Sequence, residues 1–251
     1  MSKQNEHNVR IRNKSQGHLP ALILVSVLLI AAVLAGLYLE RTTVIRSVHF
    51  SGNEFTPDSL LFSAMEDPVS LSADSVRFDS LFHQLRTLPY VDDVSVRMNR
   101  HGSLTFQIRE HRPIALLPGH NSRNYLSEKG TLLPLIPGKA VNVPILHGVE
   151  SEWVISNRPH KAVRESLEFL ITARECDLCW ITISEVGWNP DEGVIALTHE
   201  QSVKLIFGES NYREKLQSWR EFYKTVVPSR GLRAFHTLDL RFKNQIVAKH
   251  T

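Results

Sequence analysis

The chain has 251 residues, 42% of them hydrophobic and 22% charged, a composition typical of folded rather than disordered protein. Its formal net charge is +3, and residues 1–18 carry all of that excess, so the rest of the chain has no overall charge to attract nucleic acid. The length allows one or two domains.

The first predicted element is an uncharged apolar run, LPALILVSVLLIAAVLAGLYL, at residues 19–39. A helix of this length is about 30 Å long, which matches the hydrocarbon thickness of a bilayer. The basic residues before it predict that residues 1–18 stay in the cytoplasm and that the chain after residue 39 is exported. A cleaved signal peptide is the alternative, because Val33-Leu34-Ala35 is a tolerable cleavage site.

The next region is predicted to have the element order β-α-α-β-β. The spacing of apolar residues predicts a strand at 44–50, a helix after 57, a helix at 78–85, and strands at 94–98 and 104–108. Thr56 and Pro57 are interpreted as the N-cap and the first residue of the first helix. We expect the two helices to cover one face of the sheet, which makes a small α+β domain.

The remaining region is predicted to be a mixed β-sheet domain with flanking helices. The expected elements are a strand-turn-strand at 124–134, a helix at 163–171, strands at 183–186, 194–197 and 203–207, a helix at 212–226, and a hairpin with arms at 238–242 and 246–248. The fold class predicted for the whole chain is therefore α+β with one N-terminal transmembrane helix.

Three phrases in the first region resemble a POTRA domain. They are V-x-F-x-G-N at 48–53, L-P-Y-V-x-x-V-x-V at 88–96 and L-x-F-x-I-x-E-x-x-P-I-A at 104–115. A single POTRA domain directly after a single N-terminal span resembles the FtsQ/DivIB cell-division family, and the phrase D-L-R-aromatic at 239–242 resembles the ending of that family. The resemblance implies a cytoplasmic tail at 1–18, a transmembrane helix at 19–39, a POTRA domain at 43–117 and a β domain at 118–251.

The resemblance also implies a function. Members of the family are non-catalytic scaffolds of septum assembly, held in the cytoplasmic (inner) membrane by one helix, with most of the chain outside the cytoplasm at the division site. They link early and late divisome proteins. The alternative is a POTRA-bearing component of an envelope transport or secretion system, which would call for further POTRA repeats or a C-terminal barrel. Neither is visible in the sequence.

Motifs of catalysis are missing from the sequence. It contains no G-x-S-x-G, no G-x-x-x-x-G-K-[ST] and no G-x-G-x-x-G after a strand. His199-Glu200 begins like a zinc-protease motif, but Val203 stands where the second histidine would be. We therefore expect no enzyme activity, no metal, no cofactor and no small-molecule substrate.

Cys176 and Cys179 form a C-x-x-C pair. Structural thiols, a local disulfide and a functional redox or metal-binding pair all remain open. The pair is expected to close a helix rather than open one, which is the reverse of the arrangement in thioredoxin-like proteins.

The final strand is predicted to lie at a sheet edge, because it closes a hairpin whose other arm is already paired. Such an edge can receive a strand from another chain. In the FtsQ/DivIB family this end of the β domain binds FtsB (DivIC), which pairs with FtsL. The positions that match are Arg241, Phe242, Asn244, Ile246, Val247 and Ala248. An ordinary core hairpin is the alternative interpretation.

Overall fold

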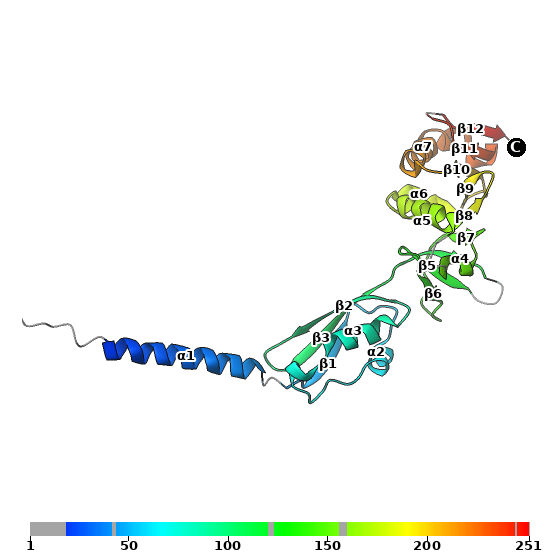
Figure 1. The fold of residues 1–251 in the computed structure, drawn as a ribbon. Coiled ribbons are helices and arrows are strands. Elements are labelled where there is room, and N and C mark those ends of the chain that lie inside the picture. The colour runs from blue at the N-terminus through cyan, green and yellow to red at the C-terminus, as the bar shows by residue number, and fades with distance from the viewer. Residues whose placement is uncertain (1–18, 42–43, 120–122, 156–159, 244, 251) are drawn as a thin grey trace, which may run out of the picture. The chain divides into compact units, whose positions relative to one another are not determined.

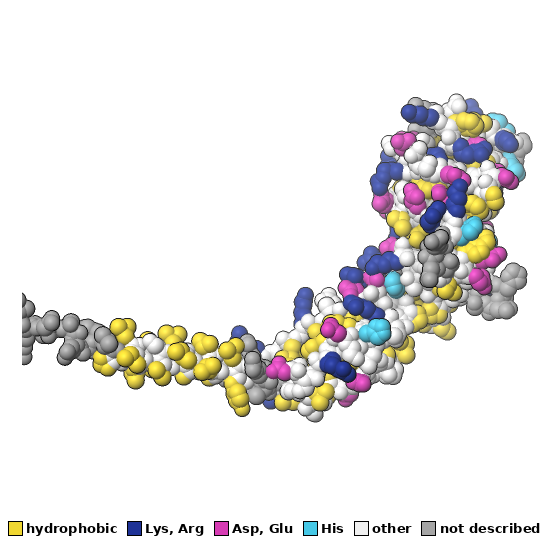
Figure 2. All heavy atoms as spheres, viewed as in Figure 1, with side chains coloured by type: hydrophobic (Ala, Val, Ile, Leu, Met, Phe, Trp, Pro, Cys, Tyr) yellow, Lys and Arg dark blue, Asp and Glu magenta, His cyan; other side chains and the backbone are white. Residues whose placement is uncertain are grey.

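The computed structural model describes residues 19–41, 44–119, 123–155, 160–243 and 245–250. It begins with the helix α1 (Leu19–Arg41), and the segment Pro20–Tyr38 within it is long and apolar enough to cross a membrane. Figure 2 shows hydrophobic side chains along this helix. The apolar run expected to span the bilayer is thus one continuous helix, whereas the basic tail at 1–18 lies outside the described residues.

The first sheet has three strands in the order β1-β3-β2, with two helices between β1 and β2 along the chain (Figure 1). The elements are β1 (Ser47–Ser51), α2 (Asp58–Ala64), the short 3-10 helix Ala73–Ser75, α3 (Phe78–Arg86), β2 (Val91–Met98) and β3 (Ser103–Glu110). The predicted order β-α-α-β-β is confirmed.

Aromatic rings join the two helices to the sheet. The ring of Phe50 in β1 lies 4.8 Å from that of Phe62 in α2 and 5.7 Å from that of Phe106 in β3. The ring of Phe82 in α3 meets Phe106 edge-on at 6.4 Å. Phe106 is fully buried by these contacts. One face of the sheet is therefore covered by both helices, as the apolar spacing predicts.

Two predictions about the start of this region are wrong in detail. The strand expected at 44–50 begins at Ser47, and Val44 instead makes a single bridge to Ser72. The helix α2 begins at Asp58 with Pro57 in the N-cap position, so Thr56 is not the N-cap. The reason is that Pro57 has an extended backbone (φ −68°, ψ 150°) and is not yet helical. The backbone N–H of Thr56, just before it, is bound by a carboxylate from another strand.

That carboxylate belongs to Glu110, at the end of β3. It accepts backbone N–H groups from Glu54, Phe55 and Thr56 at 2.7, 2.8 and 2.7 Å. Hydrogen bonds to a charged acceptor are roughly twice as strong as neutral ones. Glu110 therefore fixes the loop between β1 and α2, just ahead of the helix.

The second sheet has nine strands in the described residues, in the order β12-β11-β10-β9-β8-β7-β4-β5-β6. The strands are β4 (Pro113–Leu117), β5 (Asn124–Ser127), β6 (Leu132–Pro134), β7 (Ile145–His147), β8 (Ile183–Asn189), β9 (Gly193–Thr198), β10 (Lys204–Gly208), β11 (Phe235–Asp239) and β12 (Val247–His250). The pairs β4/β7, β7/β8 and β10/β11 are parallel and the others are antiparallel. The expected mixed sheet is confirmed.

The position of the strand β4 differs from what the expected domain boundary between residues 117 and 118 implies. It pairs with β5 and β7, and it makes no pairing with the three-stranded sheet. Residues 113–117 therefore belong to the second sheet, because their apolar side chains complete its core: Ile114, Ala115 and Leu117 are buried there. The other domain boundaries stay predictions.

Helices α5 (Lys161–Arg174), α6 (Asp177–Thr182) and α7 (Tyr212–Thr225) lie beside the strands β8 to β11 in Figure 1. Two shorter helices, α4 (Ser151–Ile155) and α8 (Val227–Arg230), and the 3-10 turn Leu232–Ala234 complete the described elements.

Aromatic side chains from α5, α7 and β10 pack together in the core between the second sheet and its helices. The ring of Phe169 lies 4.6 Å from that of Phe207 and 5.5 Å from that of Tyr212. Trp219 is fully buried, and its indole N–H donates to the hydroxyl of Thr182 at 3.0 Å. A buried indole that has a partner avoids the desolvation penalty of an unpaired donor. These contacts attach α5 and α7 to one face of the sheet.

We predict that Glu110→Ala destabilises the full-length protein in detergent micelles by about 2 kcal/mol, because three backbone donors lose a charged acceptor. Denaturant unfolding followed by circular dichroism measures the change. Glu66→Ala is the matched control, since Glu66 is an exposed glutamate at the other end of the segment 54–66. An equal loss in the two variants would contradict the role assigned to Glu110.

Candidate partner-binding edge

The strand β12 ends the sheet order, as expected for the closing arm of the hairpin. It is antiparallel to β11, with Asp239 opposite Val247, Leu238 opposite Ala248 and Thr237 opposite Lys249. On its other side no strand is paired within the part of the chain that the structure describes. Backbone groups of β12 that face away from β11 are thus available to a further strand.

Side chains on the two faces of the hairpin have different roles. Ile246 and Ala248 are partly buried and pack against the core beneath the helices. Val247, between them, is 42% exposed, and Phe242 before the turn is 47% exposed. Alternate residues of a strand point to opposite faces. One set of residues therefore attaches the strand, while Val247 stays accessible beside the free edge.

The turn of the hairpin begins with an ion pair between Asp239 and Arg241. The guanidinium Nη2 lies 2.6 Å from Oδ2 of Asp239, Nε donates to Oδ1 at 3.0 Å, and the backbone N–H of Arg241 donates to the same Oδ1 at 3.0 Å. Bidentate pairing of this kind restricts the orientation of both groups. The pair therefore fixes the direction in which the chain leaves β11.

The path of Arg241 also depends on Gly208 in β10. A Cβ atom at Gly208 would lie 2.9 Å from Cγ of Arg241, and Gly208 has φ +70°. Only glycine adopts that conformation at little cost, and only glycine leaves room for the arginine side chain. The backbone N–H of Leu240 donates to the carbonyl of Ile206 at 2.9 Å, which continues the attachment to β10 beyond Asp239.

Electrostatics around the turn favour the ionised form of Asp239. Partial burial opposes ionisation, but hydrogen bonds from Arg241 outweigh burial and lower the pKa of Asp239 below its ordinary value of 3.8. On α7, burial and then repulsion by Arg241 lower the pKa of Lys215, whose ammonium donates to the carbonyls of Phe207 and Ser210 at 2.6 and 2.7 Å. Lys243 and Lys249 are exposed, so the accessible edge is flanked by positive charge.

The six residues expected to bind a partner fall into three groups. Phe242 and Val247 are exposed, Arg241 is engaged with Asp239, and Ile246 and Ala248 are partly buried. Asn244 lies outside the described residues. Their role in binding stays a prediction. The sequence analysis did not assign Asp239 or Gly208 to the candidate edge, although the spacing D-x-R was a signal for Asp239.

The cysteine pair lies at the opposite end of a helix from the one expected. Cys176 is the N-cap of α6, so the pair opens a helix instead of closing one. Cys176 and Cys179 form a disulfide, with Cα atoms 5.2 Å apart. The helix expected at 163–171 extends to Arg174, and a second helix that was not expected, α6, begins at Asp177. Elsewhere in the described residues, no three His, Cys, Asp or Glu side chains form a group that could hold a metal.

These features define a class: an α+β protein in which an apolar helix and a β-α-α-β-β unit precede a mixed sheet that ends in an edge hairpin. The family model "FtsQ/DivIB, C-terminal related" matches residues 112–249. The chain belongs to the FtsQ/DivIB family. This membership and the N-terminal apolar helix fit a single-pass membrane protein.

Individual relatives carry the name "Cell division protein FtsQ". The chain is 25% identical over 178 residues to the protein of Geotalea daltonii, with 69% of this chain and 64% of that protein covered. It is 27% identical to the protein of Salinibacter ruber, with 59% and 60% covered, and 27% identical to that of Rhodothermus marinus, with 64% and 61% covered. The chain thus spans about three-fifths of the length of these curated relatives.

Among solved structures, a similar chain is the major extracytoplasmic domain of the trans isomer of the cell division protein DivIB from Geobacillus stearothermophilus. The sequence identity is 18%, the TM-score is 0.33, and the likeness covers 48% of this chain and 97% of that one.

We predict that Asp239→Asn destabilises the protein by about 1–2 kcal/mol near pH 7, because the substitution removes the charge-assisted hydrogen bonds to Arg241. A group whose pKa is lower in the folded state stabilises that state above its unfolded pKa, and the contribution is lost as pH falls through the folded pKa. The difference in the free energy of unfolding between wild type and variant should therefore shrink below pH 3.8, the ordinary pKa of Asp239.

Urea unfolding at pH 7, 5 and 3 measures this difference. Asp191→Asn, at an exposed aspartate in the turn between β8 and β9, is the control for a general charge effect. A difference between wild type and Asp239→Asn that stays constant over this pH range would contradict the assignment.

Proposed function

We propose that this chain is a non-catalytic scaffold of bacterial cell division that recruits a partner protein by adding a strand to the edge of β12. The observation that carries the proposal is the free edge itself. β12 is held on one side by β11, carries the accessible side chain of Val247, and ends the sheet in a member of the FtsQ/DivIB family. The names of its relatives support a role in cell division.

The partner segment that fits this edge has a definite chemistry. Backbone hydrogen bonds to β12 require an extended segment, and an apolar residue would cover Val247 and Phe242. The exposed Lys243 and Lys249 favour acidic residues at both ends of the segment and disfavour promiscuous pairing with basic strands. We assign this role to FtsB (DivIC), with FtsL bound to the same assembly.

We further propose how the chain is placed in the cell. The tail at 1–18 lies in the cytoplasm, α1 anchors the protein in the inner membrane, and the two sheets lie outside the cytoplasm at the septum. The three-stranded sheet with its two helices serves as the POTRA domain and offers a surface to early division proteins. The nine-stranded sheet recruits late ones. In this arrangement the protein links both groups without catalysing a reaction.

We predict that Val247→Glu weakens binding of the FtsB (DivIC) partner by about tenfold or more, which corresponds to about 1.4 kcal/mol. A buried, unpaired carboxylate at the strand-strand contact and the lost apolar contact both act against the complex. Titration of the full-length protein in micelles with the partner measures the affinity. Denaturant unfolding of the variant should be unchanged, because Val247 is 42% exposed in the free protein.

Ile155→Glu is the matched control, since Ile155 is a branched apolar residue at the end of α4 that is 73% exposed. It should bind the partner as the wild type does. Unchanged affinity of Val247→Glu, or an equal loss in the two variants, would contradict docking on the β12 edge.

We also predict that depletion of this protein in its own bacterium produces smooth, growing filaments without septa. Cell length and septum number, measured by microscopy with a membrane dye, report the result. Complementation with wild type should restore division, and complementation with Val247→Glu should restore it poorly. Cells of normal length with a damaged envelope would instead favour the transport alternative.

A further inference from the structure

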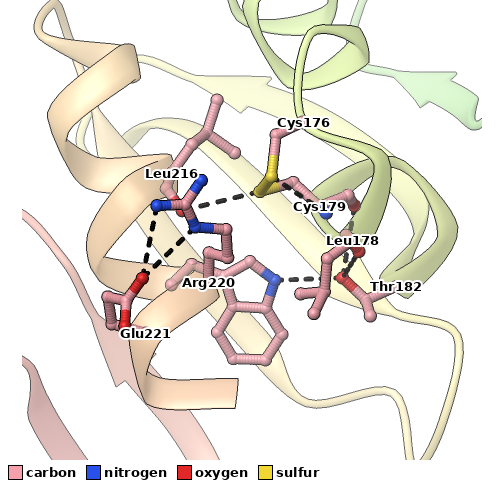
Figure 3. Close-up of a disulfide and its surroundings, with 8 residues drawn as sticks. Cys176, Leu178, Cys179, Thr182, Leu216, Arg220 and Glu221 are labelled. Atoms are coloured by element: carbon pink, nitrogen blue, oxygen red, sulfur yellow. Dashed lines mark hydrogen bonds and ion pairs between the residues drawn. A yellow bond between two sulfur atoms is a disulfide. The ribbon is translucent and has the colours of Figure 1, made fainter. Parts of the chain in front are cut away.

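The disulfide between Cys176 and Cys179 lies beside a small cavity of about 230 Å³. Cys176 contributes to the wall of this cavity, together with Thr172 and Glu175 from the end of the preceding helix segment and with Arg213, Leu216 and Arg220 from α7. Figure 3 shows the disulfide at the start of α6, facing α7. The cavity is large enough to admit the sulfur and adjacent carbon atoms of an incoming thiol.

The two sulfur atoms differ in their accessibility. Cys176 is partly exposed and borders the cavity, whereas Cys179 is 0% exposed and belongs to the hydrophobic core. A thiolate must approach the sulfur that it attacks. In the folded protein, only Cys176 offers such an approach.

Each sulfur already has the partner that its reduced form requires. The backbone N–H of Cys179 donates to Sγ of Cys176 at 3.3 Å, which stabilises negative charge on that sulfur. Sγ of Cys179 lies 3.5 Å from the carbonyl oxygen of Leu216, so the reduced S–H group has an acceptor in the core. The reduced pair therefore has a ready place in the same fold.

The wall of the cavity carries two arginines, Arg213 and Arg220, and the carboxylate of Glu175. Arg213 pairs with Glu175 at 2.5 Å, and Arg220 lies 3.3 Å from the carboxylate of Glu221. Nearby arginines favour thiolates over thiols and attract anionic reagents.

We propose that Cys176 and Cys179 form a thiol–disulfide exchange site whose partner is a dithiol protein. A thiolate of the partner attacks Sγ of Cys176, the bond between the two cysteines breaks, and the sulfur of Cys179 leaves with the electron pair and takes up a proton. The second partner thiolate then attacks the partner sulfur of the mixed disulfide and releases Cys176. The chain gains two electrons, and the partner becomes a disulfide; the reverse sequence oxidises the chain.

This site is separate from the β12 edge. It lies in α6 and α7, and its test uses no division partner, so its failure and the failure of the proposed function are distinguishable. Its effect on the fold would act through α6, because Thr182 in that helix accepts the indole N–H of Trp219.

The first experiment incubates the full-length protein in micelles with dithiothreitol at pH 7.5, followed by acid quenching, alkylation and mass spectrometry. We expect complete reduction without denaturant. In glutathione buffer, Cys179→Ser should accumulate the mixed disulfide on Cys176 at least tenfold faster than Cys176→Ser accumulates it on Cys179. Reduction of the wild type only after unfolding, or equal rates in the two variants, would overturn the proposal.

The second experiment tests the arginines. A double variant, Arg213→Gln with Arg220→Gln, keeps both cysteines. Its disulfide should react with glutathione, an anion, several-fold more slowly than that of the wild type, and the reaction with neutral 2-mercaptoethanol should be slowed less. Lys224→Gln is the matched control, because Lys224 is an exposed cation of α7 outside the cavity. An equal change in the control, or an equal effect on both reagents, would overturn the role of the arginines.

Discussion

The parallel pairing of β10 with β11 is the constraint on which the end of this structure depends. Parallel neighbours need a crossover connection, usually a helix, and α7 is that helix here. Burial of Tyr212, Leu216 and Trp219 attaches α7 to the sheet and so sets where β11 begins. With β11 placed beside β10, a tight return can only put β12 on the outer side.

The exposed edge is therefore a consequence of packing elsewhere. The core residues Phe169, Phe207 and Trp219 hold the helices, and the helices determine the crossover. Among the described strands, the crossover leaves β12 without an outer neighbour. The pair of Asp239 and Arg241 then turns the chain back at a defined point. The edge is thus positioned by contacts within the chain itself.

Sequence patterns predicted the first region well because its elements are short and regularly alternating. The strands β2 and β3 and the helix α3 lie where period-two and i, i+3, i+4 spacing placed them. The anchoring of the loop before α2 was missed because the contact is non-local: Glu110 supplies the acceptor for Thr56 from 54 positions away. Local capping rules cannot contain such a contact.

Residues of the candidate edge were recognised from the alternation around Leu238 and from the D-L-R phrase, and β12 is indeed the last strand of the sheet. The sequence could not show that Gly208 makes room for Arg241, because the two residues are distant in the chain and meet only when β10 pairs with β11. For the same reason the sequence could not show that Val247 is accessible whereas Ile246 and Ala248 are partly buried.

By itself, the sequence determined the apolar helix, the β-α-α-β-β order of the first region and the family resemblance, since these depend on composition and on spacing along the chain. Only the tertiary structure decided that β4 joins the second sheet and that Cys176 borders a cavity while Cys179 lies in the core. The physical reason is that pairing partners and burial are set by contacts between segments far apart in the chain, which a local pattern does not encode.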